Sequence, residues 1–356
     1  MLGIDRYDPP HQFGSSHAES RITRLAVGEG EQYLPFVARS HELWRELEQL
    51  TGEALLHQPG GYIITPPTKT DDDRWGSFVD RTADVAASAG ISFERHGVAQ
   101  VAERAPALRL QGDEEIGFEP TGGIVMCERA IAMQLALARS AGADMLVNTP
   151  VDAVEPGADV VKVTAAGTQY VGSKVIVATG AWFPELAPPV DAAAVRITRQ
   201  VVYWFEVDDL GQFGADRFPF VIWPGHTIDD YSAVFPIATG ARPALKVLGE
   251  QFDTETTAES VDRQVSEAEV ADFYERLVAP RLHGVTPNVV DTAVCLYTNT
   301  ADDHFLIDVH PESSRVMFAS PCSGHGFKHS TAIGEAMVAA LAGDEQALDL
   351  APFVRS

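Results

Sequence analysis

Cysteine is scarce in this chain of 356 residues, which contains only Cys127, Cys295 and Cys322. Three is an odd number, and no two of these residues have the spacing of a metal site or a redox pair. We therefore expect neither a disulfide framework nor a bound metal ion.

Positive charge is also scarce, because 26 lysines and arginines stand against 51 aspartates and glutamates, giving a formal net charge of −25. Phosphate would repel such a chain, so we expect no nucleic acid and no anionic membrane among its partners. A solvated surface tuned for solubility explains this acidity. An anionic substrate would therefore need a local pocket of positive charge.

Long apolar runs are missing as well, since none is long enough to span a bilayer, and the first residues lack a basic and apolar leader pattern. We therefore expect a cytoplasmic protein without a membrane anchor. The composition is that of an ordinary globular protein, with 45% hydrophobic and 22% charged residues. The length exceeds that of a usual single core and predicts about two domains.

One stretch, residues 321–330 with the sequence P-C-S-G-H-G-F-K-H-S, lies between an apolar run and a helical pattern. We expect a buried strand at residues 316–319 and a helix at residues 331–341, so the stretch is predicted to be a strand-to-helix turn. Gly324 and Gly326 would let the backbone approach a flat ligand. The free N–H groups at the helix start would favour negative charge beside that ligand.

A second stretch, residues 293–298 with the sequence A-V-C-L-Y-T, accompanies this turn. Together the two stretches resemble the monomeric sarcosine oxidase and N-methyltryptophan oxidase family of flavoenzymes. The motifs D-P-P-H, R-x-x-R, G-E-G and G-A-W extend the resemblance over essentially the whole chain. In that family the cysteine of A-x-C-x-Y carries covalently attached FAD, and the S-G-H-G-F-K turn faces the isoalloxazine ring.

The resemblance implies that FAD is the cofactor and that Cys295 is its point of covalent attachment. On its own surroundings, Cys295 is typical of a buried strand cysteine, and we interpret Cys322 as a packing residue. The residues that the resemblance places at the cofactor are Asp5, Ser15, Ser16, His17, Ser20, Arg21, Val151, Gly180, Trp182, Cys295, Ser323, Gly324, His325, Gly326, Phe327 and Lys328.

The resemblance also implies catalytic roles for Arg21, Arg24, Lys246, His325 and Lys328. Arg21 and Arg24 are three apart and would share a face of a helix, where by themselves they are typical of solvated cations. In the family the second arginine grips the substrate carboxylate, and we expect Lys328 to help it. A lysine in an apolar strand, such as Lys246, normally points outward, but the resemblance places it over the flavin, where it promotes reaction with oxygen.

The chain departs from the family pattern in the expected substrate pocket. The family stretch P-N-G-x-x-Y-Y-G-F-P is replaced by Y-S-A-V-F-P at residues 231–236, so its active-site tyrosine has no equivalent in register. The histidine that follows the lysine by a few positions is replaced by G-E-Q at residues 249–251. These changes leave the reaction class in place and leave the identity of the amine open.

Apolar periodicity and turn signals predict the remaining elements. Helices are expected at residues 33–50, 75–87 and 130–141, with a loop-rich stretch between the second helix and residue 123. Strands are expected at residues 144–148, 151–154, 160–164, 169–171, 174–177, 199–206, 218–223, 232–236 and 244–248.

The predicted fold class is α/β (α+β overall), with a Rossmann-like FAD-binding domain and an interleaved antiparallel-sheet substrate domain. We assign residues 1–56, 124–193 and 293–356 to the FAD domain, and residues 57–123 and 194–292 to the substrate domain.

The N-terminal residues resemble the tail of a strand that ends in an acid, Asp5, which in the family hydrogen-bonds the adenosine ribose. The G-x-G-x-x-G loop that should precede such an acid by about 20 residues is absent. We therefore expect the chain as given to be an N-terminally shortened form that binds FAD poorly and has little oxidase activity.

The expected reaction is oxidation of the N-methyl group of a small secondary amino acid, with oxygen as acceptor, by a monomer. The products would be the amino acid, formaldehyde and hydrogen peroxide. Two alternatives stay open at this stage. One is a flavin oxidase or dehydrogenase acting on a cyclic imino acid, and the other is a catalytically silent homologue that does not retain FAD.

Overall fold

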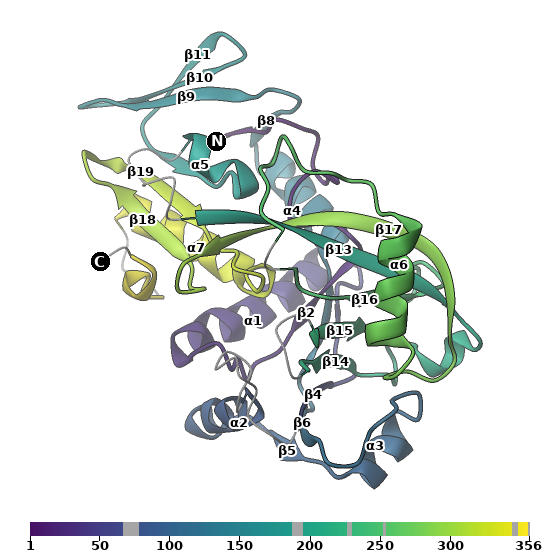
Figure 1. The fold of residues 1–356 in the computed structure, drawn as a ribbon. Helices are drawn as coiled ribbons and strands as arrows, with labels where there is room; N and C mark the ends of the chain where they lie inside the picture. The colour runs from purple at the N-terminus through teal and green to yellow at the C-terminus, as the bar shows by residue number, and fades with distance from the viewer. Residues whose placement is uncertain (67–77, 187–194, 226–229, 252–253, 344–347, 355–356) are drawn as a thin grey trace.

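The computed structural model describes residues 1–356 except 67–77, 187–194, 226–229, 252–253, 344–347 and 355–356. Helices and smaller sheets surround one large sheet (Figure 1). The helices are α1 (Leu34–Thr51), α2 (Phe78–Ala89), α3 (Val98–Arg104), α4 (Cys127–Ser140), α5 (Phe183–Leu186), α6 (Glu267–Phe273) and α7 (Ser330–Ala342). Shorter turns are η1 (Glu31–Tyr33), η2 (Gly180–Trp182), η4 (Leu210–Gln212), η7 (Phe327–His329), η8 (Ala351–Phe353) and a π-helical turn, η6 (Tyr274–Val278).

The large sheet contains eight strands and is rich in β-branched and aromatic residues, which favour strands. Its order is β17 (Val285–Thr300), β13 (Val195–Val207), β16 (Leu245–Leu248), β15 (Ser232–Phe235), β14 (Phe220–Trp223), β4 (Gly61–Thr65), β6 (Glu115–Glu119) and β5 (Glu94–Arg95). All neighbouring strands are antiparallel except β14 and β4. The long strand β17 runs across the domain boundary that we expected at residue 293.

Four smaller sheets complete the described fold. The strands β1 (Leu2–Ile4) and β8 (Asp144–Leu146) pair in parallel. A second sheet contains β2 (Ser20–Thr23), β7 (Gly123–Met126) and β3 (Leu56–His57), and a third contains β9 (Val151–Pro156), β10 (Val161–Ala165) and β11 (Thr168–Gly172). The fourth contains β12 (Val175–Val177), β19 (Ser313–Ser320) and β18 (Leu306–His310).

The strand-to-helix turn is as predicted. β19 pairs in parallel with β12, and the chain then passes through residues 321–329 into α7. α7 ends at Gly343, whose φ of 76° is the left-handed conformation that glycine adopts without a Cβ clash. A buried cluster of apolar residues packs α7 against α1 and β19, and so fixes the turn.

One of our expectations for local structure is wrong, and another is incomplete. The stretch between α2 and residue 123 is rich in loops, as expected, but it also contains β5, α3 and β6, which we did not predict from the sequence. Arg21 lies in strand β2, which pairs with β7, and is not on a helix with Arg24. Trp75, which we placed in a helix, lies outside the described residues, and α2 begins at Phe78.

Candidate active site

A cavity of about 920 Å³ lies between the strand-to-helix turn, β2 and the large sheet. This volume is within the range of cofactor and small-molecule sites. It brings together residues far apart in sequence, among them Ser15, Ser16, Arg21, Arg24, Glu29, Gly180, Gln200, Tyr231, Glu250, Cys295, Tyr297 and residues 319–328.

The turn that borders this cavity is too tight to accept side chains at its glycines. A Cβ at Gly326 would lie 1.6 Å from the carbonyl oxygen of Pro321. Gly324 has a φ of 78°, and a Cβ there would lie 2.8 Å from a ring carbon of Tyr297. The Ser323 N–H donates to the carbonyl oxygen of Thr298 in β17 over 2.9 Å. The turn is therefore fixed to β17, and its backbone stays close to the cavity.

Two cations of the cavity share one carboxylate. Arg24 Nη2 lies 2.7 Å from Glu29 Oε2, and Lys328 Nζ lies 3.1 Å from Glu29 Oε1. Burial opposes ionisation of Glu29, but the Arg24 and Lys328 cations hold the pKa of its carboxyl group well below its usual range. Burial lowers the pKa of the Lys328 ammonium, and the charge of Glu29 opposes this shift. With Lys328 protonated, the three groups have a net charge of +1.

Arg21 and Cys295 meet on another side of the cavity. Arg21 Nη2 donates to the sulfur of Cys295 over 3.8 Å, and its Nη1 donates to the carbonyl oxygen of Ser20 over 2.8 Å. Burial raises the pKa of the Cys295 thiol, although the Arg21 and Lys246 cations oppose this shift. Cys295 as a residue is 3% exposed and borders the cavity from β17.

Several polar atoms of the cavity wall point to a polar ligand. Within the described ranges, Ser15 Oγ, Ser320 Oγ and His325 Nδ1 are buried and have no hydrogen-bond partner. Burial, with Lys328 nearby, lowers the pKa of His325 to about 4, so the ring is neutral near pH 7. Gly180 has a φ of 55°, and a Cβ there would meet no atom within 4 Å. A ligand could therefore approach this backbone closely.

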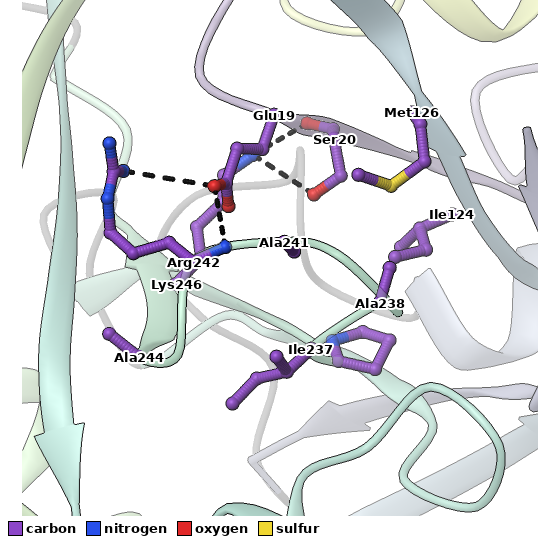
Figure 2. A pocket seen from close by; sticks show the side chains of 11 residues that line it. Glu19, Ser20, Ile124, Met126, Ile237, Ala238, Ala241, Arg242, Ala244 and Lys246 are labelled. Atoms are coloured by element: carbon purple, nitrogen blue, oxygen red, sulfur yellow. Dashed lines mark hydrogen bonds and ion pairs between the residues drawn. The ribbon is translucent and has the colours of Figure 1, made fainter. Parts of the chain in front are cut away.

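Lys246 does not border the large cavity and instead lies at a water-sized one of about 10 Å³. Figure 2 shows its Nζ directed at Ser20, where it donates to the carbonyl oxygen over 2.6 Å and to the hydroxyl over 3.4 Å. The ammonium also lies 3.9 Å from the ring centroid of Phe235, which borders the large cavity. Lys246 is 3% exposed, so the outward orientation typical of strand lysines is wrong here.

The structure brings together most of the predicted site residues. Ser15, Ser16, Arg21, Arg24, Gly180, Cys295 and residues 323–328 all border the large cavity. Predicted residues that do not border it are Asp5, His17, Ser20, Val151, Trp182 and Lys246. Among these, Asp5 accepts a hydrogen bond from the N–H of Tyr7 over 2.8 Å, and His17 is buried with its Nε2 unpaired among the described residues.

Sequence reasoning missed several residues of the cavity. Tyr231 borders it directly before β15, so a tyrosine is present although the family pattern showed none in register. Glu250 and Tyr297 also border it, and burial followed by the charge of Glu250 raises the pKa of both tyrosines well above the usual value. Cys322 borders the cavity too and accepts a hydrogen bond from the Thr298 N–H over 3.3 Å, so it does more than pack.

No cluster of three or more metal-binding side chains occurs in the part of the chain that the structure describes. Within the same part, every helix is too short or too polar to cross a membrane.

Comparison with known proteins identifies the class of protein to which this chain belongs. Residues 2–340 match the model of the FAD dependent oxidoreductase family, and the chain belongs to that family. It is an oxidoreductase that uses FAD. The monomeric sarcosine oxidase of Bacillus sp. (strain NS-129) is 32% identical over 343 residues, which cover 94% of this chain and 85% of that protein.

The N-methyl-L-tryptophan oxidase of Escherichia coli (strain K12) is 32% identical over 359 residues, which cover 99% of this chain and 91% of that protein. Among solved structures, the open form of NikD, described as an unusual amino acid oxidase essential for nikkomycin biosynthesis, has a TM-score of 0.84. It is 19% identical, and the match covers 100% of this chain and 91% of that one. This likeness confirms the predicted fold class.

The cavity fits FAD. The unpaired Ser15 and Ser320 hydroxyls and His325 Nδ1 are suited to the polar edge of a flavin ring. Arg21 and the start of α7 place positive charge beside it. Gly180, whose Cβ position is open, would let a ligand approach the backbone closely.

Proposed function

We propose that this protein oxidises the N-methyl group of a small secondary amino acid. The amine loses two electrons and becomes an imine, which water hydrolyses to formaldehyde and the free amino acid. Oxygen takes up the two electrons and two protons as hydrogen peroxide. The observation that carries the proposal is the Arg24, Glu29 and Lys328 cluster, whose net charge of +1 suits a single substrate carboxylate.

The cluster would act by orienting the substrate. Carboxylate recognition by Arg24 and Lys328 would hold the substrate with its N-methyl group turned away from the cations and toward the flavin. A positioned substrate reacts without the entropic cost of a bimolecular encounter. Bound FAD would supply the two-electron acceptor for this step.

Other residues would support the cofactor. We infer covalent attachment through Cys295, because its sulfur borders the cavity and contacts the Arg21 guanidinium. Arg21, Lys328 and the first turn of α7 would stabilise negative charge on the reduced ring system. Lys246 would promote the reaction with oxygen, since its charge contacts the Ser20 carbonyl oxygen and the ring of Phe235, a residue that borders the cavity.

Product analysis tests this function. Purified protein is incubated with N-methylglycine or N-methyl-L-tryptophan in air, and formaldehyde, amino acid and peroxide are quantified. Whatever the yield of flavin-loaded protein, we expect formaldehyde, amino acid and peroxide in equal amounts from at least one substrate. Oxidation of proline-like cyclic acids without formaldehyde would favour the alternative imino-acid reaction. The cytoplasmic location and the monomeric state stay predictions from the sequence.

A further inference from the structure

Two consecutive residues directly before β2 adopt a conformation that is unusual for side chains other than glycine. Ala18 has a φ of 71° and Glu19 a φ of 69°, both in the left-handed region. Such backbone costs conformational energy and persists only where surrounding contacts enforce it, often at functional sites. The contacts of Glu19 show what enforces it here.

The backbone of Glu19 is held by the start of α4. Its N–H donates to Glu128 Oε1 over 3.1 Å, and its carbonyl oxygen accepts from the Cys127 N–H over 2.9 Å. The carboxylate reaches in the other direction. Its Oε2 accepts from Trp204 Nε1 over 3.0 Å, and its Oε1 accepts from the Arg242 N–H over 2.9 Å. Glu19 thus links α4, β13 and the segment that leads into β16.

The contacts of Glu19 hold the residues on both sides of the hydrogen bond between Lys246 and Ser20. Ser20, the next residue after Glu19, presents the carbonyl oxygen that accepts from both Lys246 Nζ and Arg21 Nη1. Arg242, which Glu19 binds, lies four residues before Lys246 on the same segment. Figure 2 shows Glu19 between Arg242 and Ser20, with Lys246 directed at Ser20. One side chain therefore fixes both partners of the Lys246–Ser20 contact.

We propose that Glu19 is a positioning residue for Lys246. It holds the strained turn so that the Ser20 carbonyl faces the lysine, and it holds the 242–246 segment so that the lysine faces that carbonyl. The proposal rests on the role in oxygen reaction that we give to Lys246. Glu19 itself does not border the large cavity.

Stopped-flow reoxidation of the reduced flavin by oxygen provides a double-mutant test. If Glu19 acts through Lys246, Glu19→Ala should slow reoxidation about tenfold in the normal chain and less than about twofold in a Lys246→Met background. Reduction by substrate should stay within about twofold of normal in both. Equal slowing in both backgrounds, or no slowing in the normal chain, would overturn the proposal.

A second readout needs no turnover. The rate at which acetic anhydride modifies Lys246 is measured by mass spectrometry on the protein as purified. Lys246 is 3% exposed, so this rate should be low, and Glu19→Ala should raise it about tenfold or more. An unchanged rate contradicts the positioning role. If Lys246→Met leaves reoxidation unchanged while labelling rises, the role of Lys246 in oxygen reaction is wrong and the positioning stands.

Two further variants serve as controls, one for a conservative change at Glu19 and one for the loss of an exposed carboxylate elsewhere. Glu19→Gln keeps the shape and an oxygen for the Arg242 N–H but loses one acceptor, so both effects should be smaller than with alanine. Glu53→Ala removes a carboxylate from an exposed position and should change neither readout. If Glu19→Ala fails to fold, Glu19→Gln decides, and a normal labelling rate together with normal reoxidation in that variant contradicts the proposal.

Discussion

Lys328 Nζ lies 3.1 Å from Glu29 Oε1, so a cation expected to bind the substrate carboxylate already has a carboxylate partner within the chain. Arg24 contacts the other oxygen of Glu29. A substrate carboxylate would therefore join an existing ion cluster and would not meet isolated cations. Because the net charge of that cluster is +1, loss of either cation should remove its attraction for a substrate carboxylate.

The first prediction concerns this cluster. Removing one member of a desolvated charge contact costs about 2 to 5 kcal/mol, so Lys328→Met should lower kcat/KM for N-methyl amino acids by one to several orders of magnitude. Arg24→Ala should do the same. Steady-state kinetics with simple N-methyl amines, which lack a carboxylate, should show much smaller losses.

The exposed Lys162→Met, on the β10 hairpin, is the matched control and should be neutral. Equal losses on amines with and without a carboxylate would mean that the two cations serve the cofactor and not the substrate.

A second prediction concerns the linkage. Cys295 and Cys322 both border the cavity, but only Cys295 contacts Arg21. If flavin is bound, it should stay with the normal polypeptide and with Cys322→Ser after acid precipitation, and should appear in the supernatant of Cys295→Ser. Flavin that leaves the unmutated protein would exclude covalent attachment.

A third prediction is a pH dependence. Burial, with Arg21 nearby, lowers the pKa of Lys246 to about 7. The side chain is cationic below this pH and neutral above it, and only the cation stabilises the negative charge that develops on oxygen. The rate constant of reoxidation should therefore fall as the pH rises through about 7. Lys246→Met should be slow at every pH, and a normal chain with a flat profile would speak against this role.

A fourth prediction concerns the turn. Because a Cβ at Gly326 would lie 1.6 Å from a backbone oxygen, Gly326→Ala must open the turn. We expect a loss of about 1 to 3 kcal/mol in the free energy of unfolding, as for other overpacked sites, together with weaker flavin retention. In α7, a Cβ at Gly334 would meet no atom within 4 Å. Gly334→Ala should thus gain roughly 0.5 to 1 kcal/mol, and denaturant titration of both variants measures the difference.

The sequence predicted the parts of this site whose residues are neighbours in the chain, and it did not predict contacts between residues that are far apart in the chain. The turn at residues 321–330 was predictable, because its glycines, the strand before it and the helix after it are neighbours in sequence. The pairing of Glu29 with Lys328 was not, since 299 positions separate them and either residue alone resembles a solvated charge. The same holds for Glu19, whose partners lie in β13, α4 and the segment before β16.

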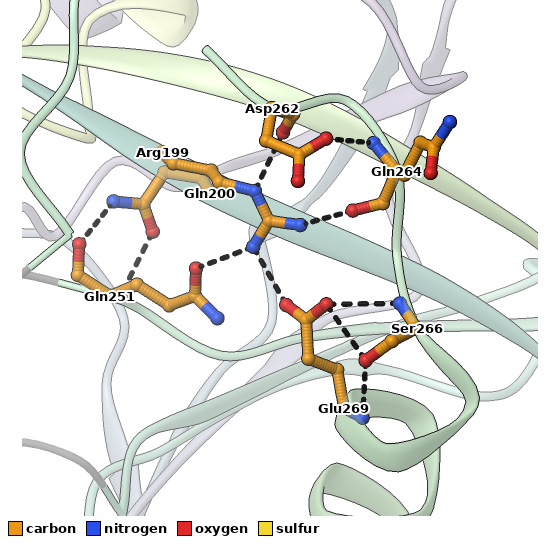
Figure 3. Close-up of polar contacts among 7 residues, drawn as sticks. All are labelled: Arg199, Gln200, Gln251, Asp262, Gln264, Ser266 and Glu269. Atoms are coloured by element: carbon orange, nitrogen blue, oxygen red, sulfur yellow. Dashed lines mark hydrogen bonds and ion pairs between the residues drawn. The ribbon is translucent and has the colours of Figure 1, made fainter.

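The local sequence pattern also failed to predict strands and buried side chains in segments where polar and apolar residues are mixed. β6 carries glutamates at both ends, yet its interior residues are buried against β4. Arg199 in β13 is buried because Glu269 and the carbonyl oxygens of Asp262 and Gln264 surround its guanidinium (Figure 3). Gln200 beside it binds both the N–H and the carbonyl oxygen of Gln251, next to the cavity residue Glu250. Only the tertiary structure supplies such partners.

We propose that this protein takes electrons from an N-methyl amino acid into its flavin. The most direct test is to mix the flavin-loaded protein with N-methylglycine or N-methyl-L-tryptophan without oxygen and to follow the visible absorbance of the flavin. We predict rapid bleaching with at least one of them, and full recovery of colour when air is admitted. Flavin that stays oxidised in the presence of both substrates would show that neither amine donates electrons to it, which contradicts the proposed function.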